Sequence, residues 1–135
     1  MALPLAFLSC TATVVLDELT EGLGIGGSRK VDRGTGFMPV HIECLHRTPI
    51  GLLYAVAHYY ESNGDLVPDP DVTVARTAGG WSLVSLQNSL AYRVAVHFHA
   101  DGTVEVDERE QRDLCEFVET WMGNVREQQG LTVRR

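Results

Sequence analysis

The chain has 135 residues, which suits one domain of ordinary size. Hydrophobic residues make up 44% of it and charged residues 21%, which excludes wholesale disorder and predicts a packed core. Eighteen Asp and Glu against eleven Lys and Arg give a net charge of −7. This charge argues against a protein whose main work is to bind nucleic-acid phosphates.

The N-terminal part predicts one helix followed by a connector. The helix is expected to be capped by Thr11 or Thr13 and to run to about Leu23, with its valines and leucines on one side. The glycine-rich run 22–27 ends it, and residues 28–36 are expected to form a mobile connector. The glycine run neither follows a strand nor opens a helix, so a dinucleotide-binding loop is not expected.

The middle of the chain predicts a meander of strands, because apolar residues alternate with polar ones and turn residues separate the runs. Residues 65–71 are expected to be a loop, because Pro68 and Pro70 lack backbone donors. In the run 91–99, the two-residue spacing places His97 and His99 on the same side. The expected strands are 37–44, 50–60, 71–78, 81–87, 91–99 and 103–106.

The clearest helix is the last one. Asp107 and Glu110 have the spacing of a capping box, apolar residues follow at helical intervals, and Gly130 is a plausible stop. The sequence therefore predicts an α+β fold, with a mostly antiparallel sheet of about five or six strands and an N-terminal and a C-terminal helix packed on one face. Residues 1–35 would hold the first helix and connector, 36–130 the core of the same single domain, and 131–135 a tail.

The three cysteines, Cys10, Cys44 and Cys115, are widely spaced and form no CxxC pair. This pattern supports neither a disulfide framework nor a four-cysteine zinc site, and it favours a reducing cytoplasm. Each is expected to be a buried thiol. Asp17 and Glu18 interrupt the apolar opening of the chain before it reaches the roughly 20 residues of a membrane span, so no membrane anchor is expected.

Three stretches together resemble a widespread family of uncharacterised bacterial, plasmid and phage proteins. They are His58–Asp71 (HYYESNGDLVPDPD), the Gly80-Trp81 strand with Gln87, and Phe117–Gln129 (FVETWMGNVREQQ). The resemblance covers residues 36–130 and is weaker over the first thirty-five. It implies the same architecture and brings no established catalytic residues to this chain.

The segment around the Asn63-Gly64 turn carries four carboxylates, those of Glu61, Asp65, Asp69 and Asp71. Such a group could bind a hard cation, although the spacing is not that of an EF-hand. It could also face a protein partner. The simplest alternative is that these side chains make turn and loop hydrogen bonds.

His97 and His99 could begin a zinc or iron site, which would need a third ligand such as His41 or His58. The alternative is an exposed polar strand face with ordinary histidines. There is no GxSxG elbow and no recognisable Cys-His arrangement, so an enzyme is not the leading interpretation and no cofactor is expected.

Negative charge is concentrated near the last helix. Between Asp101 and Glu119 there are eight acidic and two basic residues, a net of −6 against −7 for the whole chain. Such a surface could be solvated, or it could dock on a basic protein groove through residues such as Glu108, Glu116 and Glu119.

The leading hypothesis is a cytoplasmic, non-enzymatic accessory protein that acts through protein contacts. In one version it is a mobile-element inhibitor of a nucleic-acid-handling host defence complex. The alternative is a metal-binding module or small metal-dependent enzyme that uses the His97/His99 pair. Direct binding to nucleic acid would have to use Arg29, Lys30, Arg33 and the Arg134-Arg135 tail against a repulsive field, and is not expected. The sequence indicates no oligomeric state.

Overall fold

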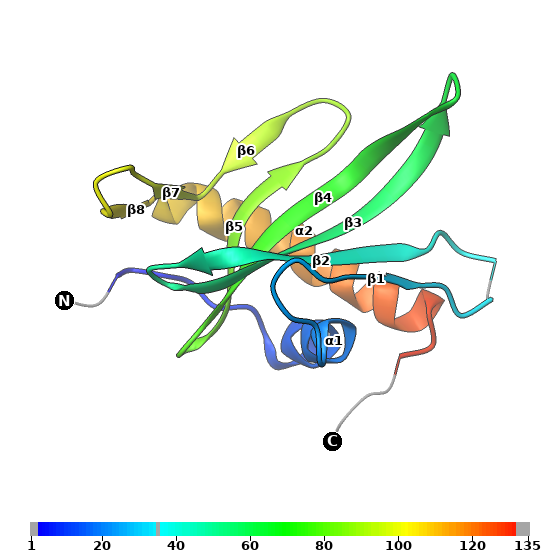
Figure 1. Cartoon of the computed structure of the whole chain (residues 1–135), viewed down its shortest axis with the longest axis horizontal. Coiled ribbons are helices and arrows are strands. Elements are labelled where there is room, and N and C mark those ends of the chain that lie inside the picture. The colour runs from blue at the N-terminus through cyan, green and yellow to red at the C-terminus, as the bar shows by residue number, and fades with distance from the viewer. Residues whose placement is uncertain (1–2, 35, 132–135) are drawn as a thin grey trace.

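The structure, a computed structural model, describes residues 3–34 and 36–131, except for the side chains of residues 61, 62, 66 and 68. A six-stranded antiparallel sheet carries two helices, and a two-stranded hairpin lies at one end (Figure 1). The sheet order is β1 (Ser28–Val31), β2 (Val40–Thr48), β3 (Gly51–Ser62), β4 (Asp65–Thr77), β5 (Gly80–Gln87), β6 (Tyr92–Val94). The hairpin is β7 (Val96–Phe98) and β8 (Val104–Val106), and the helices are α1 (Cys10–Thr20) and α2 (Glu108–Gln128). The predicted fold class is confirmed.

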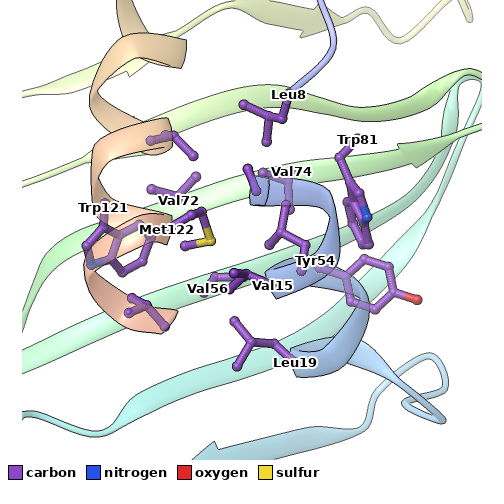
Figure 2. Close-up of a cluster of buried hydrophobic side chains, with 14 of the residues drawn as sticks. Leu8, Val15, Leu19, Tyr54, Val56, Val72, Val74, Trp81, Trp121 and Met122 are labelled. Carbon is purple, nitrogen blue, oxygen red and sulfur yellow. The ribbon is translucent and has the colours of Figure 1, made fainter. Parts of the chain in front are cut away.

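Both helices pack on the same face of the sheet and form one hydrophobic core (Figure 2). The alternation of side chains along each strand sends every second residue into this core. Figure 2 shows the side chains of α1 and α2 meeting those of the central strands. The buried residues labelled there are Leu8, Val15, Leu19, Tyr54, Val56, Val72, Val74, Trp81, Trp121 and Met122.

Helix α1 begins earlier than the sequence predicts. Its N-cap is Ser9, whose Oγ accepts a hydrogen bond from the Ala12 amide at 3.3 Å, so neither Thr11 nor Thr13 caps it. The Ser9 hydroxyl also donates to Glu119 on α2, at 2.6 Å. A contact with a residue 110 positions away fixes the start of this helix, and such a contact is invisible to local pattern.

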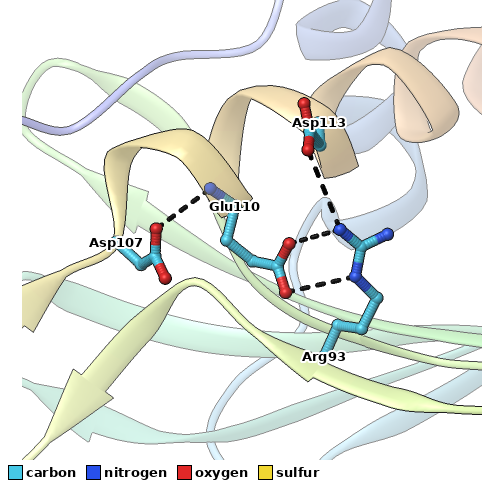
Figure 3. A network of polar contacts seen from close by, with 4 residues as sticks. All are labelled: Arg93, Asp107, Glu110 and Asp113. Atoms are coloured by element: carbon cyan, nitrogen blue, oxygen red, sulfur yellow. Dashed lines mark hydrogen bonds and ion pairs between the residues drawn. The ribbon is translucent and has the colours of Figure 1, made fainter.

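Helix α2 begins at the predicted cap. The Asp107 carboxylate accepts a hydrogen bond from the Glu110 amide at 3.0 Å (Figure 3). The second half of a capping box is absent, because the Asp107 amide donates instead to the Ala95 carbonyl and the Glu110 carboxylate turns to Arg93. Leu131, expected in the tail, is buried in the core, and residues 132–135 lie outside the described residues.

The prediction of a connector over residues 28–36 is wrong at its start. Ser28–Val31 is an edge strand that pairs with β2. The Arg29 guanidinium donates to the carbonyls of Leu19 and Glu21, at 2.8 and 2.6 Å, and so ties the strand to the C-terminal end of α1. The orphan carbonyls of a helix end need such donors, which explains why this charged segment is ordered.

The prediction of a loop over residues 65–71 is also wrong, because these residues begin the long strand β4. Pro68 lies opposite Tyr59 of β3, whereas β5 pairs with β4 only from Asp71 onward. The prolines therefore lie where β4 has a neighbour on one side only, and a missing amide costs no ladder hydrogen bond there. The β3–β4 hairpin extends beyond the other strands (Figure 1).

The predicted strand 91–99 is divided at Ala95 between the two sheets. The Ala95 amide donates to the Val84 carbonyl and its own carbonyl accepts from Asp107, so its backbone joins β5 to the start of α2. The hairpin β7–β8 turns away and packs a second, smaller apolar cluster on the opposite face of the sheet. The buried members of that cluster are Leu53, Ala75, Val84 and Val96.

The cysteines differ in burial. Cys44 is fully buried in the main core, as predicted, and Cys115 is partly buried beside it. Cys10 is exposed at the first turn of α1, so the prediction of a buried thiol is wrong there. Within residues 3–34 and 36–131, no helix is both long and apolar enough to cross a membrane.

Candidate functional site on the uncovered sheet face

The sheet has one covered face and one that is largely uncovered. Along β2, Val40, Ile42 and Cys44 are buried under the helices, while His41 and Glu43 point the other way. On the face opposite the helices, the hairpin β7–β8 covers the area around its small apolar cluster and leaves the rest of the face open. What is left is a polar surface that runs across the strands.

Strand register orders this surface into two rows of cross-strand neighbours. The first row is Lys30, His41, Ala57, Asp71, Gln87 and Tyr92. The second row is Ser28, Glu43, Ala55, Thr73, Ser85 and Val94. We call these two rows, together with Tyr59, the polar sheet face.

A shallow hollow of about 270 Å³ lies on the polar sheet face over β1, β2 and β3. Two alanines of β3, Ala55 and Ala57, form its floor, because their methyl groups are shorter than the side chains on either side. Its lining also includes Ser28, Lys30, His41, Glu43 and Tyr59. Asp71 lies opposite Ala57 on β4 and borders the hollow on that side.

His41 and Tyr59 meet at one end of the hollow. Their ring centroids are 5.0 Å apart and the rings are nearly perpendicular, at 85°. Burial, and then the charge of Lys30, lower the pKa of His41, which favours the neutral imidazole. Burial, with Asp71 and Glu43, raises the pKa of Tyr59, so its hydroxyl stays protonated and can donate a hydrogen bond.

The two carboxylates of the polar sheet face lack a basic partner. Burial first, and the charge of Glu43 second, raise the pKa of Asp71. The two carboxylates lie on opposite sides of the two alanines, and within the described residues neither forms an ion pair with a Lys or Arg.

The structure separates the four acidic residues predicted around the Asn63-Gly64 turn. Asp65 is exposed at the tip of the β3–β4 hairpin, Asp69 is half-buried, and Asp71 lies near the middle of the sheet. The six residue-to-residue steps from Asp65 to Asp71 span roughly 20 Å of strand. Asp65 and Asp71 are therefore too far apart to bind one ion together, and the side chain of Glu61 lies outside the described residues.

Helix α2 places Glu108, Glu116 and Glu119 on the helix side of the sheet, away from Asp71, whereas Asp101 and Glu105 belong to the β7–β8 hairpin. Glu108 and Glu116 are exposed, as a partner-binding role would require. Glu119 accepts hydrogen bonds from the Ser9 amide and hydroxyl, at 2.7 and 2.6 Å, which gives its carboxylate an internal use. The Arg93 guanidinium lies between Glu110 and Asp113 (Figure 3), so part of the negative field is neutralised within the fold.

His97 and His99 lie exposed on the β7–β8 hairpin, where His99 Nε2 is 3.2 Å from Glu105 Oε1. Of the proposed third ligands, His41 is on the polar sheet face and His58 is on the helix-covered face. Across the described ranges, no group of three or more His, Cys, Asp or Glu is placed to hold a metal ion. The metal-binding interpretation stays a prediction with two candidate ligands.

His58 is buried against α2. Its Nδ1 accepts a hydrogen bond from Trp121 Nε1 at 3.3 Å, and its buried Nε2 has no hydrogen-bond partner among the described residues. Burial, and then the charge of His41, lower its pKa, so the neutral form is favoured. This histidine belongs to the core rather than to the hollow.

Sequence reasoning missed Glu43 and Tyr59 as members of a site, and it considered Lys30 only as a contact for nucleic acid. The available signal was the Ala55-x-Ala57 spacing within a strand that is otherwise bulky, since small residues on one parity leave space above the sheet. The residues around that space come from four strands, and no spacing within one segment brings them together.

The sequence model of a family described as a domain of unknown function, DUF6908, matches residues 15–131. The chain belongs to this family. In this DUF6908 chain the match includes most of α1 and all of β1, so it reaches further toward the N-terminus than the resemblance over residues 36–130. No match was found among curated proteins or among solved structures.

Proposed function

We propose that this DUF6908 domain is a non-enzymatic accessory protein that acts through protein contacts made by the polar sheet face. One observation carries the proposal: both helices cover the same face of the sheet, and the other face presents two rows of side chains with uncompensated carboxylates. The hollow is open, and its volume of about 270 Å³ falls just below the roughly 300–1,000 Å³ of ordinary small-molecule sites, so we favour a protein partner.

The net charge of −7 favours a partner with a basic surface. Proteins that handle nucleic acid carry such surfaces, because they must attract phosphates. In a concrete version of the proposal, the domain is encoded by a mobile element and occupies the basic groove of a host defence complex. The resemblance to plasmid and phage proteins supports this version.

Partner capture in the native host tests the proposal. Wild type should recover a protein that the double variant Glu43→Lys/Asp71→Lys loses, because charge reversal on the polar sheet face would repel a basic surface. The matched control is Glu108→Lys/Glu116→Lys, which makes the same charge change on the outer side of α2. Equal recovery by wild type and the Glu43/Asp71 variant, with both proteins folded, would reject the polar sheet face as the contact surface.

A further inference from the structure

We propose that the hollow on the polar sheet face binds an arginine side chain of the partner, with Glu43 and Asp71 as its carboxylate acceptors. This inference rests on the proposed protein-binding function and specifies its chemistry.

The shape of the hollow fits one extended side chain. Ala55 and Ala57 give it an apolar floor between strands that carry longer polar side chains. The methylene groups of an arginine can lie along such a floor while the charged end reaches the polar border. At about 270 Å³ and open to solvent, the space is too small for a helix or a strand.

The charges of the hollow fit a guanidinium group. Glu43 is on β2 and Asp71 on β4, so the strand that carries the alanines separates the two carboxylates. The backbones of two strands with one between them lie roughly 10 Å apart, and both side chains border the space above the middle strand. A planar guanidinium with five N–H donors can bond to a carboxylate on each side, whereas a lysine ammonium is a single point charge.

The remaining groups that face the hollow tolerate this ligand. His41 is held neutral and Tyr59 protonated, so neither adds a charge, and both present aromatic rings, on which guanidinium groups stack. The lining has two cationic residues, Arg29 and Lys30, both on β1. The Arg29 guanidinium donates to the carbonyls of Leu19 and Glu21 at the end of α1, and Lys30 is the member of its row farthest from Asp71. An incoming arginine is therefore expected on the Asp71 side.

Nuclear magnetic resonance titration with a short peptide tests the inference. The probe is acetyl-Gly-Arg-Gly-amide, and the matched probe contains citrulline, which has nearly the same shape without the charge. The arginine peptide should shift the amide resonances of Ala55, Ala57 and Tyr59, and the citrulline peptide should not. Asp71→Asn should weaken the arginine peptide about tenfold, because a hydrogen bond to a charged group is lost.

Glu43→Gln should weaken binding in the same way, and Glu127→Gln, which removes an exposed charge from α2, should leave it unchanged. Equal binding of the citrulline peptide, or an equal loss in Glu127→Gln, would overturn the inference. If partner capture depends on Glu43 and Asp71 but the arginine peptide shifts none of these resonances, the proposed function stands and the arginine is rejected. If the peptide binds as expected while capture is insensitive to both residues, the protein-contact proposal fails instead.

Discussion

The two faces of the sheet differ in the side chains that they carry. The helix-covered face consists of large apolar side chains such as Tyr54, Trp81 and Leu83, each at most 2% exposed. The polar sheet face instead carries alanines and ionisable groups along the same strands, where the helix-covered face carries large apolar residues and valines. An antiparallel sheet needs only one dry face to fold, so the other is free to serve contact with a partner.

The polar groups that are buried on the two faces also differ. On the helix side, His58 is buried with one nitrogen hydrogen-bonded to Trp121, and the other finds no partner within the part of the chain that the structure describes. On the polar sheet face, Asp71 is half-buried beside another carboxylate. Both arrangements cost stability, but the first is enclosed by the core and the second is open to a ligand. Only the second can be relieved by binding.

The largest expected effect tests which face stabilises the fold. Leu83→Ala on the helix-covered face should lower the free energy of unfolding by about 2–5 kcal/mol, because it leaves a cavity in the main core. Thr73→Ala on the polar sheet face should cost less than about 1 kcal/mol. Urea denaturation of both variants measures the difference, and equal losses would contradict the division of roles.

His58 should make the protein less stable in acid. Its pKa is lowered in the fold from 6.5, so below pH 6.5 the unfolded chain binds more protons than the folded one. The free energy of unfolding should therefore fall as the pH drops through 6.5 towards the folded-state pKa. His58→Phe should reduce this dependence and leave the share due to His41. Denaturation curves recorded from pH 7.5 to 5 measure this dependence, and an unchanged dependence in His58→Phe would contradict the prediction.

Asp71 should act with the opposite sign. Its pKa is raised in the fold from 3.8. Between pH 3.8 and the higher folded-state pKa, the folded chain therefore binds more protons than the unfolded chain, and the free energy of unfolding falls as the pH rises. Asp71→Asn is therefore expected to be slightly more stable than wild type at neutral pH, with the difference vanishing below pH 3.8. Thermal melts across that range measure it, with the exposed Asp65→Asn as control. A destabilised Asp71→Asn at pH 7 would show that the carboxylate is structural.

The smallest effect is expected at the ion pairs of Arg93. Arg93→Gln removes its contacts with Glu110 and Asp113 at the start of α2 (Figure 3). Because the group is exposed, the melting temperature should fall only slightly, and added salt should shrink the difference. Arg109→Gln, which removes an exposed charge from the same helix, is the control. A large, salt-independent loss would mean that this network fixes the packing of β6 on α2.

Local pattern was sufficient for elements whose signals lie within a few residues. The cap of α2 at Asp107 depends on a residue three positions away. The Asn63-Gly64 turn depends on adjacent residues that adopt positive φ, at 52° and 86°. The expected strand 50–60 became β3, and its apolar and aromatic residues suit a strand with a neighbour on each side in the sheet.

Local pattern failed where a distant partner decides the conformation. Pro68 and Pro70 are compatible with β4 only because β5 stops short of them, and Ala95 divides a continuous strand pattern because its backbone bonds to Val84 and Asp107. The polar sheet face follows the same logic. The sequence by itself determined that strands with alternating apolar and polar residues would bury one face of the sheet. It also determined that the protein would carry an acidic surface. Only the tertiary structure placed Glu43 and Asp71 on opposite sides of two alanines, because strand register is set by pairing between segments and not within them.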